Sequence, residues 1–343
     1  MNKKLENESF AYYLTKYFNS YLKEQKGISD NTFSSYKDTF SLFLSYCMLD
    51  KHISPDKMLI SDFNKELIEA FLHYLSVQRR CKDSSRNQRL AAIHAFFKFI
   101  MYESPEHLQI CQKVLSVQFK KMKKGTINYL PGEGIKTILE QPDLNTKRGR
   151  RDMVLLTTLY DTAARVSEIA GVTVGDLQLG EFPAVKLTGK GSKTRFVAIS
   201  SQSSLLLKKY MEENKLNDVS KRCYPLFCNR NGESLSRAGI SHILKKYADQ
   251  ARTKAPDYIP EAISPHSFRH SKAVHMLQAG VNLIYIRDVL GHESIVTTEV
   301  YAKVDSEAKR NAINSAYKNA SQSLYPSWRK DGSLLNWLQS LGK

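Results

Sequence analysis

Four short segments in the second half of the chain contain side chains that can act on a phosphate group. In the first, Ser264 followed by Pro265 predicts a helix start, so His266 and Arg269 lie three residues apart on one face. Two donors at a helix N-terminus suit an anion, because the backbone N–H groups and the helix dipole also attract negative charge. By itself such an HxxR pair more often has a structural role.

The other three segments are equally ambiguous when each is taken alone. Arg165 and Glu168 stand three residues apart at the end of an otherwise apolar helix, where an arginine is costly unless it faces a partner or a ligand. Glu168 either forms a surface ion pair or holds the guanidinium in place for a substrate. The third segment contains His292, with Tyr301 nine residues later, and the fourth puts Lys190 at the tip of a glycine-flanked hairpin.

The ordered set of segments, rather than any one of them, indicates a function. The chain reads Arg-Val-Ser-Glu at 165–168, Gly-Lys-Gly-Ser-Lys-Thr-Arg at 189–195, Pro-His-Ser-Phe-Arg-His at 265–270 and Leu-Gly-His at 290–292, followed by Tyr301. This set resembles the tyrosine recombinase family, particularly its Xer-like and transposon-encoded members, over about residues 151–304. Four signatures in that order rarely arise by chance.

The resemblance implies a role for each of these residues. Arg165 and Arg269 would hold the non-bridging oxygens of the scissile phosphate. Tyr301 would be the nucleophile, giving a 3′-phosphotyrosyl link and a free 5′-hydroxyl, with His266 as the candidate that assists its deprotonation. Lys190 would give a proton to the departing 5′-oxygen.

The resemblance also assigns supporting residues and implies that no cofactor is needed. His292 would donate a hydrogen bond to the same phosphate, and Glu168 would orient the first arginine. Lys193 and Arg195 compete with Lys190 for the role of general acid. The arginines replace a metal ion, and the phosphotyrosyl link keeps the bond energy, so neither metal nor ATP is expected. The sequence accordingly has no GxxxxGK[ST] loop and no cluster of Asp and Glu suited to a two-metal site.

The charge of the chain indicates an acidic partner. Its 51 Lys and Arg against 34 Asp and Glu leave a net charge of +17, which fits nucleic acid best, although ribosomal and membrane-surface proteins share this property. Five scattered cysteines without paired spacing favour a reducing compartment. The N-terminus lacks the apolar run of a signal peptide, and no stretch approaches the ~20 apolar residues of a membrane span. We expect a cytoplasmic protein associated with the bacterial nucleoid.

Apolar and aromatic residues recur at helical spacing through the first third of the chain, and its 343 residues favour two domains. We expect an all-helical domain of four or five helices over 1–117, which resembles the core-binding (SAM-like) domain of the family by pattern. A turn between two of these helices is rich in basic residues that either contact DNA or are simply solvated: Arg79, Arg80, Lys82, Arg86 and Arg89.

A basic linker over 118–130 and a catalytic domain over 131–305 follow. The linker carries four lysines that could follow a DNA backbone or merely be solvated, namely Lys120, Lys121, Lys123 and Lys124. In the catalytic domain we expect helices over 133–140 and 151–170, a β-hairpin around the glycines at 189 and 191, and mostly helix from 203 onward. The fold class is mainly α with a small β-hairpin (α+β), in a two-domain DNA clamp.

The last segment, 306–343, is expected to contain a helix that in the family packs on a neighbouring protomer. The resemblance therefore implies a homo-tetramer on two double-stranded DNA sites, with a monomer or dimer on one, and leaves room for an accessory protein. Its apolar residues either anchor a partner subunit or fold back on their own domain: Trp328, Leu335, Trp337, Leu338 and Leu341.

These observations favour a site-specific DNA recombinase that integrates and excises a mobile element. The helical domain begins within the first ten residues, so we expect no separate arm-binding domain and a simple recombination site. The alternatives are resolution of chromosome or plasmid dimers by the same chemistry, a type IB topoisomerase, and a non-catalytic DNA-binding protein. The Leu-Gly-His signature and the helix after Tyr301 disfavour the topoisomerase, and the occupation of every catalytic position disfavours the non-catalytic protein.

Overall fold

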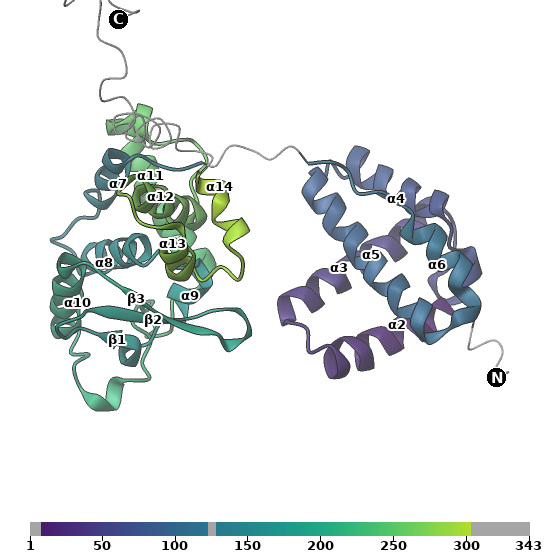
Figure 1. Cartoon of the computed structure of the whole chain (residues 1–343), viewed down its shortest axis with the longest axis horizontal. Helices are drawn as coiled ribbons and strands as arrows, with labels where there is room; N and C mark the ends of the chain where they lie inside the picture. Colours follow the sequence, from purple (N-terminus) through teal and green to yellow (C-terminus); the bar gives the residue numbers. More distant parts are fainter. Residues whose placement is uncertain (1–7, 123–127, 303–343) are drawn as a thin grey trace, which may run out of the picture. The chain divides into compact units, whose positions relative to one another are not determined.

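Figure 1 shows the chain as a computed structural model, which describes residues 8–122 and 128–302. The chain divides into two compact units, Met1–Gly125 (unit 1) and Thr126–Lys343 (unit 2). Lys123, Lys124 and the segment 306–343 lie outside the described residues, so the expectations for them stay predictions. No helix in the described ranges is long and apolar enough to cross a membrane.

Unit 1 is all helical where it is described, as the apolar spacing predicted. A π-helix, Tyr17–Gln25, continues the first α-helix directly. The α-helices are α2 (Phe10–Lys16), α3 (Asp30–Asp50), α4 (Lys65–Val77), α5 (Asp83–Glu103) and α6 (Leu108–Leu115).

Aromatic side chains at helical spacing form the centre of unit 1. The ring of Phe96, from α5, meets the rings of Phe10, Tyr17 and Phe40 edge-on, at centroid distances of 5.5, 5.2 and 5.1 Å. All four rings are buried. Such edge-to-face pairs add to the free energy gained by burying the rings, so the aromatic stripe seen in the sequence serves the core.

Unit 2 consists of a group of helices with a small sheet at one edge (Figure 1). The sheet has the antiparallel order β1-β2-β3, with strands β1 (Leu177–Gln178), β2 (Ala184–Thr188) and β3 (Thr194–Ala198). The predicted hairpin is confirmed as β2 and β3, whereas the short β1 was not predicted. The helices are α7 (Gly132–Leu139), α8 (Lys147–Asp161), α9 (Val166–Ala170), α10 (Ser201–Glu213), α11 (Arg237–Lys254), α12 (Pro265–Gln278), α13 (Leu283–Leu290) and α14 (Glu299–Ala302).

The prediction of one helix over 151–170 was wrong, because the structure has two. Helix α8 ends at Asp161, and Ala163 adopts a left-handed φ of 48°, which breaks the helix. Arg165 is then extended and forms the N-cap of α9. The apolar spacing continues across this break and so concealed the turn, whose Ala163 carbonyl accepts a hydrogen bond from Arg269.

The predicted helix start at Pro265 is confirmed as the start of α12. Ser264 is its N-cap, and the backbone N–H of Ser264 donates to Ser267 Oγ at 3.2 Å. Proline at the first helical position fits because that position has no intrahelical acceptor for an N–H group. Helix α12 also contributes Ala273 and Val274 to a small buried cluster beneath Tyr301.

Candidate active site

A buried carboxylate connects two arginines from different elements of unit 2. Glu168 of α9 accepts hydrogen bonds from the Arg165 guanidinium at 2.8 Å and from both terminal nitrogens of Arg195, in β3, at 2.9 and 2.8 Å. The backbone N–H of Arg165 also donates to Glu168, at 2.8 Å. Glu168 is 3% exposed. The carboxylate therefore fixes the orientation of both guanidinium groups.

The pKa of Glu168 reflects this arrangement. Burial alone would raise the pKa, but the hydrogen bonds and charge of Arg195, together with those of Arg165, lower it from 4.5 to about 2. The carboxylate is thus ionised at every physiological pH, as an arginine partner requires.

Arg269, buried in α12, is held by backbone oxygens instead of a carboxylate. Its guanidinium donates to the carbonyl of Ala163, at 2.8 Å, and to that of Leu290. Arg165 donates to the next carbonyl along the chain, that of Gly291, at 3.2 Å. Because consecutive carbonyls at the end of α13 bind the two guanidinium groups, these groups lie beside each other. We call Arg165, Arg195, Arg269 and Glu168 the arginine cluster.

Positive charge is in excess within the arginine cluster, since it contains three guanidinium groups and one carboxylate, which pairs with Arg165 and Arg195. Burial and the charge of Arg165 lower even the pKa of Arg269, to about 10. Two histidines respond in the same direction. Burial, then the charges of Arg269 and Arg165, lower the pKa of the partly exposed His266 and bring that of His292 to about 4. Both imidazoles are neutral at pH 7.

A glycine is required at position 291, the C-cap of α13, both by its backbone conformation and by the nearby Arg195 side chain. The φ of Gly291 is 61°, in the left-handed region, and an added Cβ would lie 2.9 Å from Arg195 Nη1. The next residue, His292, shares a hydrogen bond of 3.0 Å with Thr298, three residues before Tyr301. The Leu-Gly-His signature thus connects the arginine cluster to the segment that carries Tyr301.

Tyr301, in α14, is 3% exposed and its hydroxyl lies 2.8 Å from Nδ1 of His270 in α12. Burial raises the pKa of the phenol, and the charges of Arg269 and Arg165 oppose that effect. The phenol is therefore protonated at neutral pH and lies within the electric field of the arginine cluster.

The hairpin tip carries the lysines considered for proton transfer. The backbone of Lys190 lies in a short 3-10 turn between β2 and β3, and its side chain is outside what the structure describes. Lys193 is exposed and pairs with Glu293 at 2.7 Å. Gly189 lies close to the arginine cluster, since an added Cβ would be 3.1 Å from a Glu168 oxygen. The hairpin base is thereby placed beside the arginine cluster.

Each nitrogen of the Arg195 guanidinium donates a hydrogen bond within the protein. Its Nε donates to the carbonyl of Val289 at 2.9 Å, and its other two nitrogens bind Glu168. The side chain is 15% exposed. In this position Arg195 fixes Glu168 and the end of α13. Its roles in DNA contact and as a general acid stay predictions.

The basic residues predicted to contact DNA from unit 1 differ in their surroundings. Arg79, Arg80 and Lys82 are exposed in the turn before α5. Arg86 donates to Asn87 at 3.2 Å, and Arg89 donates to the Ser85 carbonyl at 3.4 Å.

Arg89 also lines a cavity. Its Nε is buried without a hydrogen-bond partner, and the side chain lines a cavity of about 330 Å³ between α3 and α5. Of the lysines that follow α6, Lys120 pairs with Asp83 at 2.9 Å and Lys121 is exposed.

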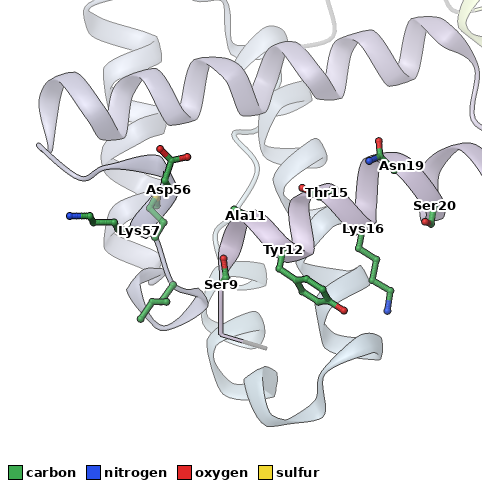
Figure 2. A pocket seen from close by; sticks show the side chains of 11 residues that line it. Ser9, Ala11, Tyr12, Thr15, Lys16, Asn19, Ser20, Asp56 and Lys57 are labelled. Carbon is green, nitrogen blue, oxygen red and sulfur yellow. The ribbon is translucent and has the colours of Figure 1, made fainter. Parts of the chain in front are cut away.

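A larger cavity, of about 810 Å³, runs along α2 in unit 1 (Figure 2). Tyr12 and Lys16 line it from α2, Asn19 from the π-helix that follows, and Asp56 and Lys57 from a short 3-10 helix, Pro55–Lys57. Lys16 is paired with Glu103. The arginine cluster belongs to unit 2, so this cavity is separate from the candidate active site and its lining offers no comparable set of catalytic groups.

Two features of the site, the role of His270 and the pairing of Arg195 with Glu168, were not predicted from the sequence. His270 stood inside the quoted Pro-His-Ser-Phe-Arg-His segment, and its distance of four residues from His266 placed both on one helix face. That spacing could have singled it out. Nothing in the sequence indicated that Arg195 would share Glu168 with Arg165, because the hairpin and α9 must pack together before Arg195 and Glu168 meet.

The chain matches two parts of a known protein family. Residues 128–308 match the phage integrase family, and residues 15–104 match the N-terminal SAM-like domain of phage integrases. A putative integrase/recombinase of Sinorhizobium fredii is 32% identical over 338 residues, which covers 98% of this chain and 99% of that protein. The tyrosine recombinase XerD of Oceanobacillus iheyensis is 31% identical and covers 90% of this chain and 99% of its own.

Solved structures share the fold at lower identity. The Tn1549 transposon integrase in complex with transposon right end DNA has a TM-score of 0.67 and 13% identity, covering 89% of this chain and 98% of that one. The XerH site-specific recombinase bound to difH, in a pre-cleavage complex, has a TM-score of 0.63 and 20% identity, covering 82% and 78%.

Replacing Glu168 by glutamine should destabilise unit 2. The substitution leaves two neighbouring guanidinium groups without their carboxylate, and breaking a buried ion pair costs about 3–5 kcal/mol. Urea unfolding of the native protein and of Glu168→Gln measures the loss in unfolding free energy. The control is Glu213→Gln, whose partly exposed pair with Arg150 (2.9 Å) should contribute at most about 1 kcal/mol. Equal losses for the two variants would contradict the structural role of Glu168.

The native protein and the Glu168→Gln variant should also differ in how their stability responds to acid. The folded-state pKa of Glu168, about 2, lies below its usual 4.5, so the carboxylate contributes its full stability above about pH 4.5. That contribution is lost as the pH falls toward 2. The difference in unfolding free energy between the native protein and Glu168→Gln should therefore shrink over this interval, and a difference that stays constant would contradict the lowered pKa.

Gly291→Ala should lose more stability and activity than Gly280→Ala. Both glycines have positive φ, 61° and 80°, so both substitutions carry a backbone cost of about 1–2 kcal/mol. Only at Gly291 would the new Cβ displace Arg195, since nothing lies within 4 Å of the Cβ at Gly280. Unfolding free energies and DNA cleavage rates test this. Loss of cleavage in both variants would point to the backbone alone.

Proposed function

The chain belongs to the phage integrase family and is a tyrosine recombinase, and from that membership we propose that it cuts and rejoins DNA through a covalent link to Tyr301. The main support for this proposal is that Arg269 and Arg165 donate to the consecutive carbonyls of Leu290 and Gly291. Two guanidinium groups held beside each other match the two non-bridging oxygens of one phosphodiester.

The charge of the arginine cluster fits the reaction proposed for it. A phosphodiester carries one negative charge, and attack by a phenolate produces a five-coordinate phosphorus species that carries two. Three guanidinium groups with one carboxylate partner leave an excess of positive charge where that negative charge develops. Because Glu168 and the backbone carbonyls already fix Arg165 and Arg269, little reorganisation is needed as the reaction proceeds.

We assign the other groups as follows. Tyr301 attacks phosphorus, the bond to the 5′-oxygen breaks, and Lys190 gives that oxygen a proton as the hairpin approaches the DNA. His292, neutral and held by Thr298, donates a hydrogen bond to the phosphate. His266 is a second neutral imidazole on the same side of α12 as Arg269 and can contact the phosphate. Reversal of these steps with a new 5′-hydroxyl completes strand exchange.

The DNA partner is proposed to be a double-stranded recombination site bound by both units. Support comes from the net charge of +17 and from the exposed Arg79, Arg80 and Lys82 in unit 1. The Arg86 and Arg89 side chains and the lysines from 120 to 124 would extend the phosphate contacts. Recombination joins two sites with two cleavages each, so we propose a homo-tetramer as the active form, working in the bacterial cytoplasm with the chromosome. An accessory protein could complete this assembly.

We propose integration and excision of a mobile element as the biological role. The relative that covers nearly all of the chain, at 32% identity, is named a putative integrase/recombinase. The tyrosine recombinase XerD is almost as similar, at 31% identity, and makes dimer resolution the second candidate. The two roles use the same chemistry and differ in the DNA sites that are joined.

Tyr301→Phe should bind a recombination site normally and form no covalent adduct. Removing one hydroxyl keeps the buried ring in place but removes the nucleophile. The substrate is a nicked duplex taken from the DNA that flanks the gene, on which a cleaved end escapes and the adduct accumulates. Strand exchange between two such sites, compared with relaxation of a plasmid without them, separates a recombinase from a topoisomerase. An adduct that persists in Tyr301→Phe would refute the assignment.

Arg165→Ala and Arg269→Ala should each slow cleavage of that substrate. Loss of one preorganised donor to a developing oxyanion costs about 10²- to 10³-fold in rate. Single-turnover cleavage measures the chemical step, and gel-shift titration with the site reports binding separately. Arg150→Ala, which removes an arginine paired with Glu213 at the surface, is the matched control. Near-normal cleavage by both cluster variants would exclude the phosphate-clamp role.

A further inference from the structure

Among the described residues, the hydroxyl of Tyr301 has a hydrogen-bond partner in His270, a histidine to which neither the sequence signatures nor the proposed roles assign a function. Nδ1 of His270 lies 2.8 Å from the phenol oxygen, and the two ring centroids are 5.6 Å apart. His266, the histidine considered for this task, stacks on His270 at a centroid distance of 6.3 Å, one helical turn away. The geometry thus separates the two histidines of α12.

The surroundings of His270 keep its imidazole neutral. Burial, then the charges of His266 and Arg269 on the same helix, lower its pKa from 6.5. From the neighbouring elements, Tyr301 faces it from α14 and the neutral His292 from the end of α13. A neutral imidazole that carries its proton on Nε2 presents a lone pair at Nδ1, which is the atom that contacts the phenol.

We propose that His270 is a catalytic residue that accepts the phenolic proton of Tyr301 as that oxygen attacks the phosphate. The inference rests on the proposed function of Tyr301 as nucleophile and deepens it. It assigns to His270 the assistance that His266 was expected to give, and leaves His266 to contact the phosphate.

The proton and electron balance of the step is complete without a further reagent. The O–H bond of Tyr301 breaks, its electron pair forms the new bond to phosphorus, and the proton moves to Nδ1 of His270. The bond between phosphorus and the 5′-oxygen breaks, and that oxygen takes a different proton from the general acid. In the rejoining step His270 returns its proton to the phenolate as the phosphotyrosyl bond breaks.

The same contact also explains how a buried phenol can react. Burial raises the pKa of Tyr301, so ionisation before the attack would be unfavourable. An acceptor already in contact removes the proton during the attack, and the imidazolium that results lies beside a phosphate whose negative charge is increasing. Transfer to His270 therefore avoids a free phenolate in a buried position.

The chain provides a matched control on the same helix. His275 follows His270 by five residues on α12. Its Nδ1 lies 2.8 Å from the hydroxyl of Tyr160, and burial likewise lowers the pKa of His275. The two histidines are both partly buried, and this second histidine–tyrosine pair takes no part in the arginine cluster. His275→Gln thus reproduces the structural effect of the substitution without a catalytic one.

The experiment compares His270→Gln, His266→Gln and His275→Gln in single-turnover cleavage of the nicked substrate between pH 6 and 9. Glutamine can keep a hydrogen bond to the phenol but cannot take its proton. We expect His270→Gln to lose about 10²-fold or more at pH 7, the range of a general base. Its rate should rise by about tenfold per pH unit, because the phenol must then ionise by itself. His275→Gln should cleave like the native protein, and thermal unfolding and gel shifts with the site verify folding and binding.

A second measurement separates proton transfer from positioning. Incorporating 3-fluorotyrosine at position 301 makes the phenol more acidic without changing its contacts, and it should restore cleavage in His270→Gln while leaving the loss in His266→Gln in place. If His270→Gln cleaves at a near-normal rate, or if its loss is the same at every pH and with the fluorinated phenol, the proposal is wrong.

The outcome also distinguishes this inference from the function on which it rests. Peptide mapping of the adduct identifies the tyrosine that carries the DNA. An adduct on another tyrosine would refute both the assignment of Tyr301 and the role of His270. An adduct on Tyr301 that forms normally in His270→Gln would refute the role of His270 alone.

Discussion

The buried carboxylate of Glu168 is the constraint on which the rest of the site depends. It binds one guanidinium from the N-cap of α9 and another from β3, and it does so at 3% exposure, where an unpaired charge would be strongly destabilising. Arg195 in turn binds the Val289 carbonyl, so the hairpin is attached to the end of α13. The position of the hairpin, of α9 and of α13 is therefore set by one group of charged hydrogen bonds.

The end of α13 contacts both the arginines and the segment that carries Tyr301. Its last carbonyls bind Arg269 and Arg165, Gly291 turns the chain in a conformation that fits against Arg195, and His292 holds Thr298 just before Tyr301. A displacement at any one of these contacts would move the arginines relative to the tyrosine. These contacts give a physical reason for the Leu-Gly-His signature at 290–292, in which only His292 has a proposed catalytic role.

The electrostatics of the site favour a negatively charged ligand at every described position. Positive charge is in excess around one carboxylate. Burial, together with neighbouring charges, lowers the pKa of His266, His270 and His292 and keeps their imidazoles neutral at pH 7. Neutral imidazoles can donate to a phosphate through one nitrogen and accept a proton through the other. Charged imidazoles could do only the first.

The fold was largely predictable, for a simple reason. The helices of unit 1 follow from the spacing of aromatic residues such as Phe10, Phe40 and Phe96, because the residues that repeat at that spacing are the ones that the core buries. The hairpin followed from its glycines. The break between α8 and α9 was missed, because the apolar pattern runs through it and a left-handed residue at Ala163 carries no signal in the sequence.

The sequence by itself determined which residue types take part and their order: Arg165, Glu168, Lys190, His266, Arg269, His292 and Tyr301 could all be named from their motifs. Only the tertiary structure decided how they are partnered. That Arg195 supports Glu168 and that His270, rather than His266, contacts the phenol of Tyr301 depend on contacts between segments 27 and 31 residues apart. Such contacts form when separate helices and a hairpin pack together, and local spacing along the chain does not encode them.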